Sequence, residues 1–119
     1  MVMRLGESVL VEYLGNHPIV KIIDFLLENR LFDYSKKQMA EGSGIGKVTL
    51  FKYWSKLEEA GIVKVERKFG KTKLYKLNEE NPVVKKIIEL ELALADRAAR
   101  KIAEQEKSGN NLQHAEARV

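Results

Sequence analysis

The chain has 119 residues, enough for one domain with a core, and its 45% hydrophobic and 32% charged residues exclude a wholly disordered protein. It has no cysteine and two histidines, which excludes disulfides, thiolate metal sites and a cysteine nucleophile and argues against a histidine-based metal centre. The net charge is +4, but segment 47–76 holds nine basic and three acidic residues, a local excess typical of a nucleic-acid binder or, alternatively, of a solvated lysine-rich face.

The N-terminal segment, 1–16, predicts a short helix that Gly15 would end, because its apolar residues recur at helical spacing. A strand is the alternative, since Val9, Val11 and Tyr13 also alternate.

A second helix is predicted from Pro18 to about Asn29. Proline suits the first helical position, where its missing N–H leaves nothing unpaired, and an apolar stripe with helical period follows it. The short aromatic segment 31–34 comes next, and we expect it to form a brief strand.

A short helix with a polar start is predicted after residue 34. Ser35 and Gln38 have the spacing of a capping box, in which each side chain bonds the backbone N–H of the other residue. Met39 and Ala40 would then face inward. Segment 42–46 has three glycines in five residues and should end this helix in a tight turn.

Another helix should run from Lys47 to Ala60 and end at Gly61. Its apolar and polar residues separate onto opposite faces at 100° per residue. We expect the apolar face to consist of Leu50, Tyr53, Trp54 and Leu57, opposite Val48, Lys52, Ser55 and Glu59.

A β-hairpin is predicted after this helix. Residues 62–67 alternate between apolar and polar, which is a strand pattern, and Phe69-Gly70 marks a turn. Residues 73–77 form the return strand, with Tyr75 and Leu77 as inward positions. The hairpin tip would be the basic segment 68–71.

A long helix should begin at Asn81, as the cap, and Pro82, in the first turn. Its pattern continues to about Lys107. The sequence Ser-Gly-Asn-Asn at 108–111 should end it and leave 108–119 as a flexible tail.

The long helix carries two neighbouring apolar stripes, more than one small domain can cover. We therefore expect the same helix of a second copy to pack against it, with intramolecular packing as the alternative. The expected dimer interface consists of Val84, Ile88, Leu92, Ala95, Ala99 and Ile102. The neighbouring stripe consists of Val83, Ile87, Leu90, Leu94 and Ala98.

Residues 39–63 resemble a known family. A helix that contains Met-Ala-Glu at 39–41 leads through Gly-Ile at 44–45 into a helix that closes with Leu-Glu-Glu-Ala-Gly-Ile-Val at 57–63. This pattern is similar to the winged helix-turn-helix transcription regulators of bacteria and archaea (the MarR/ArsR-like superfamily), with an archaeal appearance over about 18–84. The resemblance implies a mainly α fold with a small β-hairpin wing, a DNA-binding domain at 17–78 and a dimerisation helix at 81–107. One departure is Gly46, where the family usually has a serine or threonine cap.

The resemblance also implies which residues contact DNA. The recognition helix would enter the major groove, the preceding helix start would meet a phosphate, and the wing would lie along the minor groove or flanking phosphates. The residues implied are Lys47, Val48, Thr49, Phe51, Lys52 and Ser55 in the recognition helix, Ser35 and Lys36 at the helix start, and Arg67, Lys68, Lys71 and Lys73 in the wing.

Several of these residues have structural alternatives. Val48 and Phe51 would touch thymine methyl groups or else pack under the N-terminal segment, and Ser35 would meet a phosphate or simply cap its helix. The wing tip would meet DNA or remain a solvated turn. Because the reading face has no arginine, asparagine or glutamine, we expect modest sequence selectivity and strong salt dependence.

The prediction is therefore a DNA-binding transcriptional regulator that binds an inverted-repeat site of double-stranded DNA as a homodimer. A DNA-binding adaptor in plasmid or chromosome segregation and a protein–protein interaction module are the alternatives. No enzyme, catalytic residue, metal or cofactor is predicted. The chain has no cysteine and no recognisable motif with a histidine near a carboxylate, and 42–46 lacks the spacing of a phosphate-binding loop. Without cysteine or a run of about 18 apolar residues, a cytoplasmic protein with no membrane partner is expected.

Overall fold

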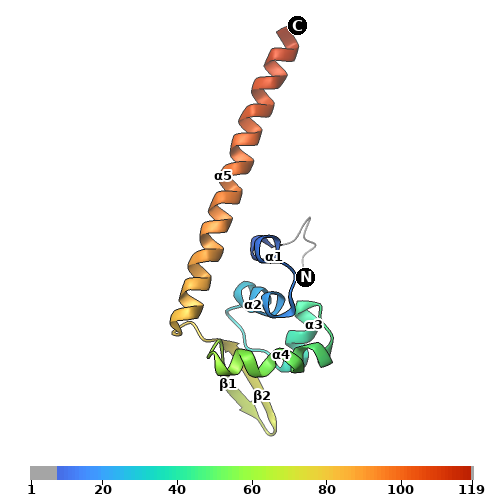
Figure 1. Ribbon diagram of the computed structural model, residues 1–119, viewed down its shortest axis with the longest axis vertical. Helices are drawn as coiled ribbons and strands as arrows, with labels where there is room; N and C mark the ends of the chain where they lie inside the picture. Colours follow the sequence, from blue (N-terminus) through green and yellow to red (C-terminus); the bar gives the residue numbers. More distant parts are fainter. Residues whose placement is uncertain (1–7, 119) are drawn as a thin grey trace.

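Five helices and one β-hairpin make up the described part of the chain. The structure is a computed structural model that describes the backbone of residues 8–118 and the side chains of residues 8–107. In chain order the elements are α1 (Val9–Leu14), α2 (Pro18–Glu28), α3 (Lys36–Ser43), α4 (Lys47–Glu59), β1 (Val63–Phe69), β2 (Thr72–Leu77) and α5 (Pro82–Arg118). The first four helices and the hairpin gather at one end of α5, which projects far beyond them (Figure 1).

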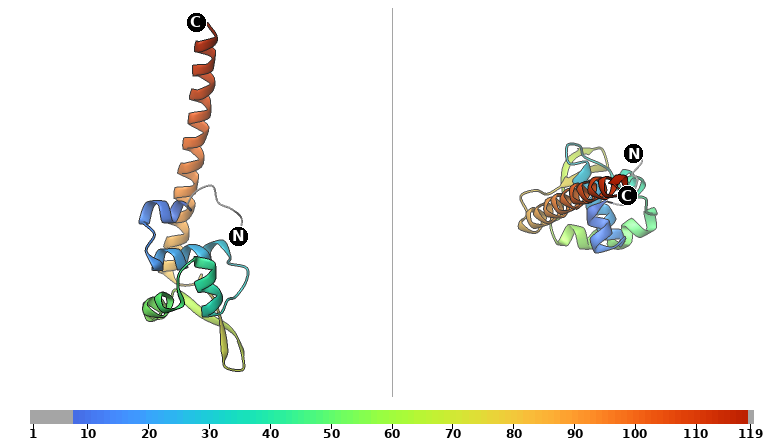
Figure 2. Two further views of the ribbon diagram at one scale, coloured as in Figure 1. Left: turned by 90° about the vertical axis from the view of Figure 1, so that its right-hand side faces the viewer. Right: turned by 90° about the horizontal axis from the view of Figure 1, so that it is seen from above.

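This order defines a winged helix-turn-helix fold, mainly α with a small β-hairpin wing, as the sequence predicts. Helices α3 and α4 are joined by a tight turn at Gly44, whose φ of 72° lies in the left-handed region that glycine adopts without strain. The hairpin follows α4 directly, and Figure 2 shows its tip pointing away from α5. The recognition-helix position therefore belongs to α4 and the wing to β1 and β2.

One hydrophobic core joins all of these elements except the far part of α5. The helical stripe of α2 contributes Ile22 and Leu26, and the inward face of α4 contributes Leu50, Trp54 and Leu57. From the other elements come Leu10, Met39, Ala40, Ile62, Val63, Tyr75, Leu77 and Val84. Each large apolar side chain that is fully buried contributes about 1.5–3 kcal/mol relative to exposure, so this packing fixes where α4 and the wing lie.

The start of the chain is helical rather than extended. Ser8 caps α1 by accepting a hydrogen bond from the N–H of Val11 at 3.1 Å, and Gly15 ends the helix with φ of 91°. The strand alternative is wrong. Residues 1–7 of the predicted N-terminal segment lie outside the described residues.

The predicted brief strand at 31–34 is reduced to a single bridge. Tyr34 pairs with Tyr75 of β2 through two backbone hydrogen bonds of 2.9 and 2.7 Å, and residues 31–33 have no strand conformation. Tyr34 thereby extends the wing sheet by one residue and attaches the α2–α3 loop to β2.

The capping box of α3 is confirmed. The Ser35 hydroxyl accepts from the Gln38 N–H at 3.1 Å, and the Gln38 side chain accepts from the Ser35 N–H at 2.9 Å. In the next turn of the helix, Met39 and Ala40 are buried as predicted. At the start of α4, Gly46 provides no side-chain cap.

Asn81 joins the end of α4 to the start of α5. Its side-chain carbonyl accepts from the Val83 N–H at 2.7 Å, which caps α5 as predicted. Its side-chain amide donates to the carbonyls of Ala60 and Gly61 at 2.8 and 2.9 Å. The long helix therefore leaves the domain from a fixed point beside the C-terminal end of α4.

The predicted end of the last helix near Lys107 is wrong, because α5 continues to Arg118. Serine, glycine and asparagine at 108–111 are weak helix formers, but none of them removes the backbone N–H as proline would. One helical glycine costs about 1 kcal/mol relative to alanine. Leucine, alanine, glutamate and arginine, which occur in 112–118, are better helix formers, and residues 108–118 of the expected tail continue the helix.

The expected dimer stripe is also wrong at its first position. Val84 is completely buried in the core of its own domain, and Ile88 packs against that core. Farther along α5, Leu92 and Ile102 are 57% and 56% exposed. The first turns of α5 belong to the monomer core because Asn81 holds them against it.

The projection of α5 dominates the shape of the molecule. The chain measures 71 × 28 × 22 Å and its radius of gyration is 18.7 Å, whereas a compact domain of this length has a radius of about 14 Å. A search of the described residues finds no helix with the length and hydropathy of a membrane span.

Gly42 provides a test of the α2–α3 packing. A Cβ at this position would overlap the ring of Phe25, which packs edge-on against Tyr34. Gly42→Ala should therefore lower the free energy of unfolding by roughly 1–3 kcal/mol in urea denaturation, despite the better helix propensity of alanine. The control is Gly46→Ser, whose Cβ would meet only the Thr49 hydroxyl at 4.0 Å, an ordinary contact, and which adds a helix cap; it should leave stability unchanged or slightly higher. Equal stability of the two variants would contradict this packing.

Candidate nucleic-acid interface

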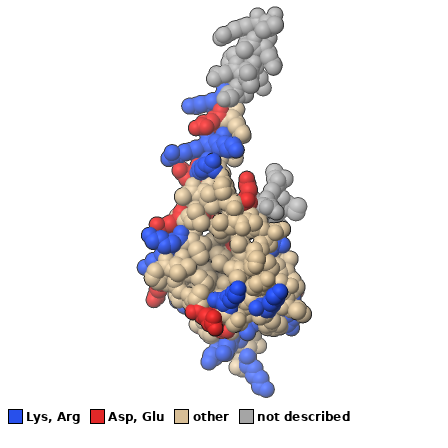
Figure 3. Space-filling view, viewed as in Figure 1, with Lys and Arg blue, Asp and Glu red and all other residues tan. Residues whose placement is uncertain are grey.

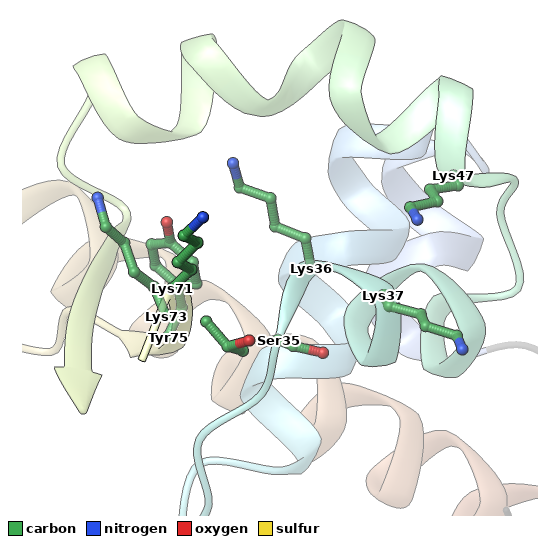
Figure 4. A pocket seen from close by; sticks show the side chains of 8 residues that line it. Ser35, Lys36, Lys37, Lys47, Lys71, Lys73 and Tyr75 are labelled. Carbon is green, nitrogen blue, oxygen red and sulfur yellow. The ribbon is translucent and has the colours of Figure 1, made fainter. Parts of the chain in front are cut away.

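Three segments of the fold meet around a cleft of about 370 Å³, which we call the basic cleft. The segments are the start of α3, the start of α4 and the wing, as Figure 4 shows. The residues that line the cleft are Ser35, Lys36, Lys37, Lys47, Lys71, Thr72, Lys73 and Tyr75.

The basic cleft has one sign of charge. Five of its lining residues are lysines and none is acidic. Figure 3 also shows Lys and Arg at the wing end of the molecule, whereas acidic and basic side chains are interspersed along α5. A cleft lined by one sign of charge concentrates the field and attracts ligands of the opposite sign. The chemistry of this site therefore favours a polyanion.

Lys36 stands over an aromatic floor. Its ammonium nitrogen lies 5.1 Å from the centre of the Trp54 ring, 5.6 Å from that of Phe51 and 6.0 Å from that of Tyr75. Trp54 and Tyr75 pack edge to face, with ring centres 4.7 Å apart. The quadrupoles of the three rings hold the cation between α4 and the wing, where Figure 4 shows it extending toward α4.

The hydroxyl of Ser35 is already used by the fold, since it caps α3 through Gln38. The capping alternative for Ser35 is thus present in the structure. The hydroxyl can still donate its own proton, and Ser35 does line the basic cleft.

The outward face of α4 carries the predicted reading residues. Lys47, Val48, Lys52 and Ser55 are exposed, Thr49 is half-buried, and Leu50 and Trp54 on the other face are buried. Val48 is 83% exposed and Phe51 is 49% exposed. These fractions disfavour the alternative in which both side chains pack under the N-terminal segment.

Tyr53 departs from its predicted place in the core. It is half-buried at the edge of α4, where its ring meets the ring of His17 edge to face at 4.9 Å. His17 caps α2 by accepting a hydrogen bond from the N–H of Ile19 at 3.1 Å. The ammonium nitrogen of Lys52 also lies over the Tyr53 ring, 5.4 Å from its centre.

A β-bulge divides the predicted wing residues between two faces. The strands pair in antiparallel register, with Val65 opposite Tyr75 and Arg67 opposite Leu74, so Glu66 is an extra residue. Because directly paired residues share a face, the bulge places Arg67 on the side of Leu74. Lys68 pairs with Lys73 and shares its face, and Lys73 lines the basic cleft.

Arg67 is held by the α2–α3 loop. Its guanidinium donates two hydrogen bonds to the Asp33 carboxylate, at 2.6 and 2.9 Å, and stacks 5.1 Å from the ring centre of Phe69. The hydrogen bonds from Arg67 hold the pKa of Asp33 below its ordinary value. Arg67 thus attaches the face of the wing that carries Leu74 to the α2–α3 loop. Its predicted contact with DNA would require Arg67 to break both hydrogen bonds to Asp33.

Sequence reasoning missed three residues of the cleft. Lys37 and Thr72 lie next to predicted site residues, and both belong to the same basic segments. Tyr75 was predicted only as a core position, and burial raises its pKa, so that it stays a neutral hydrogen-bonding group. Only the fold could reveal that Tyr75 also forms a wall of the cleft.

No metal site is evident in the part of the chain that the structure describes, where no three histidine or carboxylate side chains are grouped to bind an ion.

Two solved structures are similar to this fold. An apo mutant of Lactococcus lactis ZitR matches with 19% identity over 85% of this chain and 73% of that chain, at a TM-score of 0.51. The winged helix-turn-helix DNA-binding domain Mb0332 from Mycobacterium bovis matches with 19% identity over 82% of this chain and 95% of that chain, at a TM-score of 0.53. It is described as homodimeric and as a possible ArsR-family transcriptional regulator.

These similarities confirm the winged helix-turn-helix fold. No protein-family model matches the sequence, and no curated protein sequence is significantly similar to it.

The hydrogen bonds from Arg67 to Asp33 predict how the Asp33 carboxyl group titrates. Because the pKa of Asp33 is lowered in the folded state, its stabilising effect is complete above about pH 4 and is lost as pH falls through that lowered pKa. In carboxyl-carbon NMR, Asp33 of the Arg67→Gln variant should titrate at higher pH than wild type. Lys76→Gln, which removes the weakest of the lowering effects, should change it little. An unchanged Asp33 midpoint in Arg67→Gln would contradict these hydrogen bonds.

Proposed function

We propose that this chain is a DNA-binding transcriptional regulator that acts in the cytoplasm as a homodimer on an inverted-repeat site. The observation that carries the proposal is the position of Lys47, which begins the outward face of α4 and also lines the basic cleft. The outward face of α4 and the basic cleft therefore form one continuous surface. Double-stranded DNA is a polyanion whose major groove is wide enough to admit an α-helix.

In this proposal α4 enters the major groove and the wing lies beside it. Lys47, Thr49, Lys52 and Ser55 donate hydrogen bonds to base edges or nearby phosphates. Lys36 and the wing lysines, Lys68, Lys71 and Lys73, neutralise backbone phosphates on either side. Arg67 stays with Asp33 and sets the angle of the wing.

The similarity to Mb0332 supports both DNA binding and a homodimer, since that protein is described as a homodimeric winged helix-turn-helix DNA-binding domain. The absence of arginine, asparagine and glutamine from Lys47–Glu59 leaves recognition to lysine, hydroxyl and apolar groups. Lysine acts as a point charge, so a large part of the affinity should be electrostatic and depend on salt.

For the homodimer we propose the exposed stretch of α5 beyond the monomer core. With Val84 and Ile88 assigned to that core, the remaining interface residues are Leu92, Ala95, Ala99 and Ile102. The helix has 37 residues, which at 1.5 Å each is about 55 Å. Two such helices side by side would place the two α4 helices about 34–36 Å apart on one face of the duplex.

The experiment that tests this function is selection of bound duplexes from a random library with the purified full chain. An inverted repeat with half-sites one helical turn apart is the expected product. On the selected duplex, Lys71→Ala/Lys73→Ala should weaken binding about tenfold. The slope of log affinity against log salt concentration should become shallower by about two per protomer, because two phosphate contacts are lost. Lys64→Ala is the matched control, because register places Lys64 on the opposite face of the wing.

Two results would overturn the proposal. Failure to enrich any sequence, with binding no stronger than that of a neutral protein at low salt, would remove DNA as the ligand. Spreading along DNA beyond one discrete site would instead favour an adaptor of plasmid or chromosome segregation.

The α5 interface gives a separate prediction. Leu92→Asp/Ile102→Asp should convert the dimer to a monomer in sedimentation at micromolar concentration, because it buries two carboxylates against a partner helix. Thermal unfolding of the domain should change little, since both side chains are exposed in the monomer. Leu31→Asp, at an exposed leucine of the α2–α3 loop, should remain dimeric. A monomeric wild type would rule out this interface.

A further inference from the structure

Two large apolar side chains stand on the part of α4 that would face a base edge. Val48 is 83% exposed and Phe51 is 49% exposed, three residues apart in the N-terminal half of the helix. At this spacing the two side chains are neighbours on one helix face. Exposing them to water is unfavourable, so a ligand that covers them gains binding energy.

The surroundings of this apolar pair indicate what covers it. Lys47 and Lys52 lie beside it on α4, and the lysines of the basic cleft begin at its edge. An apolar protein segment would have to bury these cations without partners, which is costly. A polyanion that also presents apolar groups satisfies both the lysines and the pair.

The ring of Phe51 lies beside the side chain of Lys36, which lines the basic cleft. The ammonium nitrogen of Lys36 lies 5.6 Å from the Phe51 ring centre and 5.1 Å from that of Trp54, so the exposed ring continues the aromatic floor toward the reading face. A ring held on one side by a cation keeps its other side and its edge available to a ligand.

We propose that Val48 and Phe51 are specificity residues that recognise the C5-methyl groups of thymine in the major groove. This inference rests on the proposed function and names the chemical feature that the same surface selects. Thymine is the one standard base that presents an apolar group in the major groove. Contact with that methyl group removes water from Val48 and Phe51, while lysine contacts with phosphate are equal for every sequence.

The recognised DNA is therefore defined by methyl groups as well as by hydrogen bonds. A base such as uracil, which has the same hydrogen-bonding edge as thymine without the methyl group, isolates this contribution. Loss of one buried methyl contact weakens binding about fourfold. Because a homodimer reads two half-sites, the loss for a symmetric site with one such contact in each half is about sixteenfold.

The experiment compares two copies of each duplex selected by the wild-type chain, one synthesised with thymine and the other with uracil. The wild type should bind the uracil copies about fourfold to sixteenfold more weakly. In Val48→Ala/Phe51→Ala the ratio of the two affinities should approach one. Leu31→Ala, which removes an exposed apolar side chain outside this surface, should keep the wild-type ratio.

Val48→Ala alone keeps the test interpretable if the double variant folds poorly. Its side chain is almost fully exposed, and alanine is the better helix former. This variant should retain wild-type thermal stability and lose part of the thymine preference.

Two outcomes overturn the inference while leaving the proposed function intact: equal binding of thymine and uracil copies by the wild type, or selected sites with no recurrent thymine. Absence of DNA binding altogether would refute the proposed function itself. An acidic protein ligand captured in place of DNA would refute both.

Discussion

The packing of the inward face of α4 against α2 and the base of the hairpin is the constraint on which the rest of the structure depends. Leu50, Trp54 and Leu57 are buried in that contact, and Trp54 also supports Tyr75 of the wing. Without this packing, the start of α3, the start of α4 and the wing would not be held around the basic cleft. The core therefore fixes where the five lysines of the cleft lie relative to one another.

The wing shows how one extra residue divides structural and binding roles. In a regular strand Arg67 would share the face of Val65 and Tyr75, and Lys68 would point to the back. The bulge at Glu66 reverses these positions. Arg67 then pairs with Asp33 and fixes the wing to the α2–α3 loop, while Lys68 and Lys73 share the cleft side.

Most of the fold could be predicted from local signals in the sequence. The capping box at Ser35, the glycine turn and the alternation before Phe69 each act within a few residues, and the structure confirms them. Features that depend on contacts between distant residues could not be predicted. The Asp33–Arg67 pair joins residues 34 positions apart, and burial of Val84 depends on how Asn81 sets α5 against the domain. The continuation of α5 to Arg118 was not predicted, because serine, glycine and asparagine at 108–111 weaken a helix without ending it as proline does.

The proposed function requires the start of α3, the outward face of α4 and the cleft side of the wing to contact DNA together. Amide NMR of the isotope-labelled full chain, titrated with a selected duplex, measures this contact residue by residue. The largest shift changes are expected at Lys36, in the first half of α4 and from Gly70 to Lys73, with little change at Leu31 or in the exposed part of α5. Changes confined to α5 or the α2–α3 loop, with the basic cleft unaffected at saturation, would show that DNA does not bind this surface.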